Sequence, residues 1–196
     1  QDEGYRRTSC RHLGTRIGIG GRELGGKTVG IVGTGKIGLR TAAILRAMGC
    51  RVIGTSRTCR EGLRDGIEHM PLMDLLAAPD IVVLHCPLND STRGMIDAKA
   101  LQTMKKRAIL INVARGPVVD AWALREALDQ GRIAGAGIDV FDQEPPLRGD
   151  DPLLNAPNTI LTPHTAFATE ESMLARLDIV FENLSAYIAG APVHLV

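Results

Sequence analysis

The sequence predicts an α/β protein whose core is a doubly wound parallel sheet with helices on both faces. Short apolar runs typical of buried strands alternate along the chain with segments of helical spacing, which is the order that gives such a sheet. A run of glycines lies between the first expected strand and the first expected helix. The chain has 196 residues, 44% hydrophobic and 23% charged, which is long enough for one domain with a full core, or one domain with an appendage.

The glycine run Gly33–Gly38 follows the expected strand Thr28–Val32 and precedes the expected helix Leu39–Met48. Glycines at these positions allow a sharp turn, a close approach of the backbone to a pyrophosphate, and close packing of the helix on the sheet. The N–H groups at the helix N-terminus favour a phosphate there. This context predicts dinucleotide binding and a Rossmann-type sheet; the alternative is a tight turn without a ligand. The residues of the run expected to hold the cofactor are Gly33, Gly35, Lys36, Ile37 and Gly38.

Further strands and helices follow in alternation. Continuous apolar runs predict buried parallel strands, and apolar residues at helical spacing predict helices. The strands are expected at 51–55, 81–85, 108–112, 134–140 and 159–161, and the helices at 72–77, 97–104, 121–130 and 169–189. Ligands of such sheets bind at the carboxyl ends of the strands.

The composition argues against several classes of partner. The formal net charge is +1 and aromatic residues make up 3% of the chain, so nothing favours binding to nucleic acid or to an anionic membrane. No apolar run is long enough to span a bilayer, and the polar N-terminus is not that of a signal peptide. The cysteines form no C-x-x-C pair and the histidines lack metal-ligand spacing. We therefore expect a cytoplasmic protein with reduced thiols and no metal.

Three regions are expected along the chain. Residues 1–22 lack a core pattern of their own and are expected to form a connector or a dimerisation arm. Residues 23–166 are expected to form the dinucleotide-binding domain, and residues 167–196 a C-terminal helix. The arm leads us to expect a homodimer.

Three loops that follow expected strands carry side chains capable of chemistry. They contain Arg115, Glu144 and His164. Because the carboxyl ends of parallel strands share one edge of the sheet, these loops are expected to face the cofactor crevice together. Taken singly, the arginine reads as a surface charge, the glutamate as a solvated loop acid and the histidine as a capping residue. Together, beside a dinucleotide fingerprint, they indicate a catalytic set.

With these motifs the chain resembles the cofactor half of the D-isomer-specific 2-hydroxyacid dehydrogenases, in their glyoxylate/hydroxypyruvate reductase-like or phosphoglycerate dehydrogenase-like forms. The runs that carry the resemblance are Gly33–Gly38, His85–Leu88, Asn112–Gly116, Gly137–Phe141 with Glu144-Pro145, and Thr162–His164. The resemblance implies that Arg115 binds the substrate carboxylate, that His164 is the acid/base, and that Glu144 pairs with His164. It implies that Asp139 lies near the nicotinamide carboxamide. The cofactor contacts it implies outside the glycine run are Cys86, Pro87, Val113, Ala114, Arg115, Asp139, His164 and Ala166.

Two features depart from the family pattern. NAD-binding members place an acid at the end of the second strand to hold the ribose hydroxyls, whereas this chain has Ser56, Arg57 and Thr58 there. No carboxylate there would repel a 2′-phosphate, and the Arg57 guanidinium is in reach of one, so we expect NADP(H) to be preferred and NAD(H) to be possible. The alternative is that Arg57 is solvated and that Ser56 bonds a ribose hydroxyl. Family members also carry an N-terminal substrate domain, and this sequence is expected to begin near the connector that follows that domain. The apolar face of the last helix is therefore expected to be partly uncovered.

The function expected from these observations is that of an oxidoreductase, or of its cofactor-binding fragment. It would transfer a hydride between NAD(P)H and a small 2-oxo or 2-hydroxy acid such as glyoxylate, hydroxypyruvate or phosphoglycerate. The alternative is a non-catalytic dinucleotide-binding or sensing module related to corepressors of the same family. The isolated chain is expected to turn over poorly, because one wall of the cleft would be missing.

Overall fold

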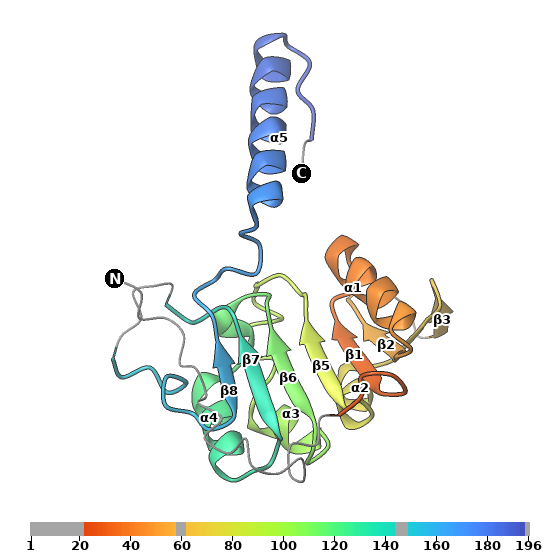
Figure 1. The fold of residues 1–196 in the computed structure, drawn as a ribbon, viewed down its shortest axis with the longest axis vertical. Coiled ribbons are helices and arrows are strands. Elements are labelled where there is room, and N and C mark those ends of the chain that lie inside the picture. The colour runs from red at the N-terminus through yellow and green to blue at the C-terminus, as the bar shows by residue number, and fades with distance from the viewer. Residues whose placement is uncertain (1–21, 58–61, 144–148, 195–196) are drawn as a thin grey trace, which may run out of the picture.

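A computed structural model describes residues 22–57, 62–143 and 149–194. Its centre is an eight-stranded sheet in the order β3-β4-β2-β1-β5-β6-β7-β8 (Figure 1). The bounds of the strands are β1 Thr28–Val32, β2 Arg51–Thr55, β3 Gly62–Arg64, β4 Ile67–His69, β5 Ile81–Leu84, β6 Ile109–Asn112, β7 Gly135–Ile138 and β8 Thr159–Leu161. All neighbouring strands pair in parallel except β3 and β4. The α/β class and the expected Rossmann-type arrangement are confirmed.

The helices begin and end at recognisable signals. Their bounds are α1 Lys36–Ala47, α2 Leu72–Ala77, α3 Ala98–Thr103, α4 Ala121–Asp129 and α5 Glu170–Ile188, with a 3-10 turn at Gly116–Val118. The side chain of Asp97 accepts a hydrogen bond from the Ala100 backbone at the start of α3, and Asp120 caps α4 in the same way. Thr169 and Ser172 form a reciprocal capping box at the start of α5.

Two hydrophobic clusters show that helices cover both faces of the sheet. In β5, Val82 and Leu84 pack into the larger cluster, which also contains Leu75 of α2 and Leu124 of α4. Val83 packs into the smaller cluster, which includes residues of α1. Successive residues of a strand point to opposite faces, so α1 lies on one face and α2 to α4 on the other. These layers place the carboxyl ends of the strands along one edge.

The sheet is not wholly parallel, which corrects the sequence expectation. A short antiparallel hairpin of β3 and β4 forms one edge, and β4 pairs in parallel with β2. The hairpin turns at Asp65 and Gly66, which have φ angles of 51° and 70°. An Asp-Gly pair is a strong hairpin signal, but strands of three residues are too short to show a period. A second correction is that α1 begins at Lys36, not Leu39, because Gly35 already serves as its N-cap.

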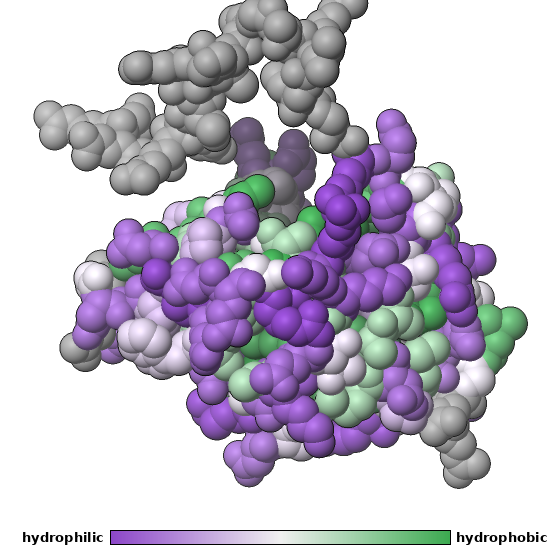
Figure 2. Space-filling view, turned by 90° about the horizontal axis from the view of Figure 1, so that it is seen from below, coloured by the Kyte–Doolittle hydropathy of each residue, from purple (hydrophilic) through white to green (hydrophobic). Residues whose placement is uncertain are grey.

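Helix α5 stands away from the sheet beyond the end of β8 (Figure 1). None of its residues is buried, and its expected apolar face is exposed, with Leu177 52% and Phe181 65% accessible. The end of the molecule away from α5 is mostly hydrophilic over the surface turned to the viewer in Figure 2. Among the described residues no helix is long and apolar enough to cross a membrane.

Several expectations fall on residues that the structure does not describe or test. The arm at 1–22 lies outside the described residues except for Arg22. Cys50 and Cys86 carry free thiols, whereas Cys10 and Cys59 lie outside the described part. The division into arm, cofactor domain and C-terminal helix stays a prediction.

Candidate active site

The site begins where the strand order reverses, between β1 and β5. Gly33 follows β1 with a φ angle of 102°, and a Cβ atom there would lie 2.6 Å from the backbone nitrogen of Cys86. The Gly33 backbone N–H donates to the Thr55 carbonyl at the end of β2, at 2.8 Å. Only glycine fits this crossing of two loops, so the ends of three neighbouring strands are drawn together here.

The other two glycines of the run have different surroundings. Gly38 is buried in α1, and a Cβ there would lie 2.1 Å from the Gly33 carbonyl oxygen, so its role is close packing of the helix on the loop. At Gly35, the N-cap of α1, a Cβ would meet no heavy atom within 4 Å. The N–H groups of the first helical turn, including those of exposed Lys36 and Ile37, lack intrahelical partners. This open helix N-terminus fits a pyrophosphate.

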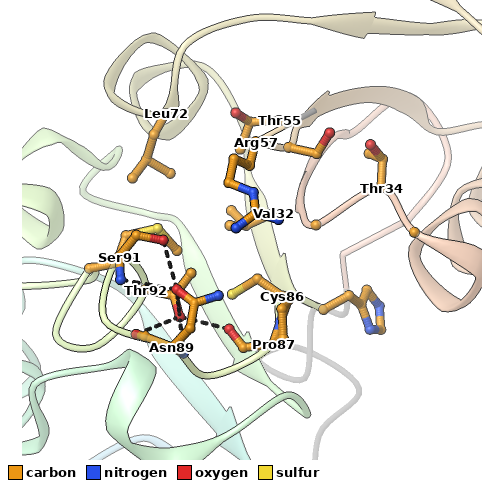
Figure 3. Close-up of a pocket in the computed structure, with 15 residues that line it drawn as sticks. Val32, Thr34, Thr55, Arg57, Leu72, Cys86, Pro87, Asn89, Ser91 and Thr92 are labelled. Carbon is orange, nitrogen blue, oxygen red and sulfur yellow. Dashed lines mark hydrogen bonds between the residues drawn. The ribbon is translucent and has the colours of Figure 1, made fainter. Parts of the chain in front are cut away.

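A hollow of about 440 Å³ opens beside this N-terminus (Figure 3). It is lined by Gly33 and Gly35, by Ser56 and Arg57 at the end of β2, and by Cys86 at the end of β5. In the close-up, the Arg57 side chain reaches from the β2 end into the hollow. None of the described residues that line it carries a carboxylate. Thr58 lies outside the described residues.

The far wall of this hollow contains residues that the sequence did not predict. The Asn89 side-chain oxygen accepts hydrogen bonds from the backbone N–H and the hydroxyl of Ser91, at 3.0 and 2.7 Å. The Thr92 hydroxyl donates to the Pro87 carbonyl at 2.7 Å. These bonds order the loop after β5 before any ligand binds (Figure 3). The turn-forming residues of 89–92 were the available signal.

A buried histidine also holds the glycine loop. Nδ1 of His69 lies 3.1 Å from the Ile67 carbonyl oxygen, and Nε2 lies 3.0 Å from the Thr34 hydroxyl. Because a carbonyl only accepts, Nδ1 carries a proton and donates it to Ile67, which leaves Nε2 to pair with the Thr34 hydroxyl. A Cβ at Gly54 would lie 2.8 Å from the Thr34 methyl group, so the glycine of β2 makes room for this pair. The two partners are far apart in sequence, and no local pattern signals them.

The second part of the site brings Arg115 and His164 to one hollow of about 600 Å³. The turn that carries Arg115 is fixed by Asn112, whose amide donates to the Arg115 carbonyl at 3.0 Å and whose oxygen accepts from the Ala114 N–H at 3.1 Å. Arg115 itself donates from Nη1 to the Ala114 carbonyl at 2.6 Å. The described residues lining this hollow are Ile37, Val113, Arg115, Asp139, His164, Ala166, Phe167, Ser172, Met173 and Arg176.

Asp139 anchors the loop that carries His164. One carboxylate oxygen accepts from the Thr162 hydroxyl at 2.5 Å and the Thr165 N–H at 2.9 Å, and the other accepts from the Ala166 N–H at 3.0 Å. Burial raises the pKa of Asp139, but these hydrogen bonds and the nearby His164 outweigh burial and lower that pKa below its usual value.

The His164 backbone lies in the left-handed region, with a φ angle of 54°. Its N–H donates to the Asp139 carbonyl at 2.8 Å, which holds this uncommon conformation in place. The imidazole packs edge-to-face with the Phe167 ring at 5.6 Å between centroids. The backbone and the ring of His164 are therefore both oriented before a ligand binds.

A third hollow joins the other two. It is lined by Cys86 and Pro87, which also line the first hollow, and by Arg115, Ala166 and Ile37, which also line the second. His85 lines the first and third, and its Nε2 is buried with no hydrogen-bond partner among the described residues. Burial lowers the pKa of His85 and raises the pKa of the Cys86 thiol, so both groups are uncharged at neutral pH. The site is a continuous trough along the carboxyl edge of the sheet, from Arg57 to His164.

The structure thus brings together most of the expected site residues. Of the catalytic set, Arg115 and His164 share a hollow, and Glu144 lies outside the described residues. Of the expected cofactor residues, Gly38 lies behind the loop as a packing residue. No cluster of potential metal ligands occurs within 22–57, 62–143 and 149–194.

Comparison with known proteins places these features in a family. Residues 3–166 match the model of the D-isomer specific 2-hydroxyacid dehydrogenase, NAD binding domain. The chain is 45% identical over 179 residues to a glyoxylate reductase of Aeropyrum pernix, covering 90% of this chain and 53% of the relative. It is 38% identical over 175 residues to a hydroxypyruvate reductase of Blautia hydrogenotrophica, covering 89% and 54%. The chain therefore spans about half the length of the curated relatives it matches.

Solved structures agree with this assignment. An acyclic imino acid reductase in complex with NADPH and D-Arg superposes with a TM-score of 0.82 at 34% identity, covering 89% of this chain and 55% of that one. The NAD-complexed D-isomer specific 2-hydroxyacid dehydrogenase from Lactobacillus delbrueckii ssp. bulgaricus gives a TM-score of 0.80 at 36% identity, covering 88% and 56%. The chain belongs to the D-isomer-specific 2-hydroxyacid dehydrogenase family, of which it contains the NAD-binding domain.

Proposed function

We propose that this chain is the dinucleotide-binding half of an oxidoreductase that interconverts small 2-oxo and 2-hydroxy acids. The observation that carries the proposal is the continuous trough, which leads from the open N-terminus of α1 to the hollow that holds Arg115 and His164. A dinucleotide is an extended ligand with a pyrophosphate between its two ends. The shape and the chemistry of the trough fit that ligand.

The residues proposed to hold the cofactor follow the trough. The backbone at Gly35, Lys36 and Ile37 would receive the pyrophosphate, while Ser56 and Arg57 would face the adenosine ribose. Cys86, Pro87, Val113, Ala114 and Ala166 would line the path to the nicotinamide. When bound, the cofactor supplies the hydride, and the protein supplies position and electrostatics.

Arg115 is proposed to bind the substrate carboxylate and His164 to exchange a proton with the substrate oxygen. A guanidinium binds a carboxylate through charge-assisted hydrogen bonds and so fixes its orientation. A positioned imidazole can protonate the oxygen on which negative charge develops. Asp139 holds the His164 loop through its three hydrogen bonds, and the carboxamide contact implied by the family resemblance would add to this role. Glu144 is proposed, on that resemblance, to pair with His164.

NADP(H) is the proposed preferred cofactor, with NAD(H) as a possible second. Arg57 reaches into the first hollow, and the described lining contains no carboxylate that would repel a 2′-phosphate (Figure 3). Relatives of known structure include one with NADPH and one in the NAD-complexed form, so the family accommodates both cofactors.

The remaining proposals concern the whole protein. The substrates would be small acids such as glyoxylate, hydroxypyruvate or phosphoglycerate, and glyoxylate and hydroxypyruvate reductases are among the relatives. We also propose a homodimer in the cytoplasm, with residues 1–22 as an arm and residues 167–196 as a helix that returns to a substrate domain.

Titration of the chain with NADPH and with NADH, followed by nicotinamide fluorescence, tests the cofactor proposal. We expect the chain to bind NADPH more tightly than NADH. Arg57→Ala should weaken NADPH binding by roughly tenfold, the effect of losing one charge-assisted hydrogen bond of about 1.5 kcal/mol, and should so remove the preference. Arg107→Ala is the matched control, because Arg107 is exposed just before β6, at the amino ends of the strands and so away from the trough. Tighter binding of NADH that is indifferent to Arg57→Ala would contradict the preference, and binding of neither cofactor would contradict the function.

A further inference from the structure

The hollow that holds Arg115 and His164 contains a second guanidinium, that of Arg176. This residue lies in the second turn of α5, on the same helical face as Ser172 and Met173, which also line the hollow. The two arginines come from different parts of the chain, one from the loop after β6 and one from α5.

The positive charge of Arg176 is not balanced within its own helix. The residues three and four positions away are Ser172, Met173, Ile179 and Val180, none of which is acidic. No ion pair or hydrogen bond links the Arg176 side chain to any residue in the described ranges. The Arg176 guanidinium is therefore available to an anion that enters the hollow.

The hollow offers no protein anion to fill that role. Asp139 is its one acidic residue among the described lining, and its carboxylate already accepts hydrogen bonds from Thr162, Thr165 and Ala166. Arg115 has one N–H group engaged with the Ala114 carbonyl, which leaves the rest of its fork for a single carboxylate. The hollow therefore presents two guanidinium groups to its ligand.

We propose that Arg176 selects a 2-oxo acid that carries a second anionic group, a carboxylate or a phosphate, at the end away from its 2-oxo group. This inference rests on the proposed function and names the substrate class of the same site. Arg115 binds the C1 carboxylate, and Arg176 binds the distal anion. The hydride adds to C2 and the proton from His164 goes to the oxygen on C2. The product is the 2-hydroxy acid with both anionic groups unchanged, and the reduced nicotinamide is oxidised.

The test compares acids of equal length with one and with two anionic groups. The pairs are 2-oxobutanoate with oxaloacetate, 2-oxopentanoate with 2-oxoglutarate, and hydroxypyruvate with its 3-phosphate ester. Dissociation constants are measured calorimetrically on the 196-residue chain, at low salt, with and without saturating NADPH. In at least one of the three pairs, we expect the dianionic acid to bind about tenfold more tightly than its monoanionic partner, which is the effect of one added charge-assisted contact.

Variants separate this role from a general effect of charge. Arg176→Gln should bring the affinities of the two acids of a pair close together, because it weakens binding of the dianionic acid by about tenfold and of the monoanionic acid much less. Arg176→Lys should keep part of the preference, since it retains the charge but loses the planar fork. Arg107→Gln removes an equal charge at the far edge of the sheet and should leave the preference intact.

The proposal is wrong if no acid binds, if no pair shows a preference, or if the preference survives Arg176→Gln. It is also wrong if Arg176→Gln weakens NADPH binding, because that result would assign Arg176 to the cofactor. Failure of the unaltered chain to bind NADPH would instead contradict the proposed function. In that case the titrations without cofactor still decide the role of Arg176.

Discussion

The substitution Gly35→Ala separates cofactor binding from folding. A Cβ at this position meets no heavy atom within 4 Å, and the Gly35 backbone, with a φ angle of −78°, is one that alanine adopts readily. The added methyl group would therefore leave the folded chain undisturbed. It would occupy the space at the α1 N-terminus where the pyrophosphate is proposed to lie.

The magnitudes follow from these surroundings. Two small effects on the free energy of unfolding oppose each other. Alanine is a poorer N-cap than glycine, which lowers this free energy, and it restricts the unfolded chain, which raises it; each effect is at most about 1 kcal/mol. For binding, displacing the phosphate from one backbone N–H removes a charge-assisted hydrogen bond of about 1.5–3 kcal/mol. This corresponds to roughly 10- to 150-fold weaker binding of the dinucleotide.

Urea unfolding and NADPH titration of the same variants provide the assay. Gly38→Ala is the contrasting change, because its Cβ would lie 2.1 Å from a backbone oxygen, and overpacking of this kind costs about 1–3 kcal/mol of stability. Gly149→Ala is the matched control, since a Cβ there also meets open space and Gly149 lines none of the three hollows. Unchanged NADPH affinity in Gly35→Ala would show that the pyrophosphate does not lie at Gly35, and a stability loss as large as that of Gly38→Ala would show that the site is not open.

The remaining predictions concern the second hollow. In a protein that also contains the substrate-binding half, His164→Ala should lower kcat by about two to four powers of ten, the range of general acid–base catalysis, and full activity would contradict its role. Arg115→Ala should reduce kcat/KM most, because the carboxylate anchor acts in the ground and transition states; an unchanged kcat/KM would contradict it. Asp139→Asn should lower the free energy of unfolding at pH 7 by about 1–3 kcal/mol, since a buried N–H loses its acceptor. Because folding lowers the pKa of Asp139, its carboxylate stabilises the fold at pH values above its ordinary pKa of 3.8, and this stabilisation is lost as the pH falls below that value. In urea unfolding, the difference in free energy between the unaltered chain and Asp139→Asn should therefore become smaller at low pH. A difference that becomes larger at low pH would contradict this prediction.

The sequence predicts the fold where a pattern is strong and local. Strands β1, β2 and β8 and helix α2 have the expected bounds, because apolar runs and flanking turn residues mark both ends. The hairpin of β3 and β4 was missed, because its three-residue strands are too short for a period, although Asp65-Gly66 marks its turn. The fold class depends on the repeated alternation of strands and helices and is insensitive to one short edge hairpin.

The candidate site was predictable where residues sit at the ends of strands. Arg115 and His164 could be placed on one rim because parallel strands end at the same edge. The pairing of His69 with Thr34 joins residues that only the packing of β4 against the glycine loop brings together. Arg176 was missed because the direction in which it points depends on how α5 leaves the sheet, and the apolar spacing of the helix does not predict that direction.

We propose that the trough from the glycine run to His164 is one nicotinamide-dinucleotide site. Backbone amide chemical-shift mapping by NMR on this 21.0 kDa chain, during titration with NADPH, tests it most directly. We expect shifts at the first turn of α1, at Ser56 and Arg57, at Cys86, and at Arg115 and Ala166, all with one dissociation constant. Shifts limited to the first hollow, or shifts at the two ends with different dissociation constants, would contradict a single continuous site.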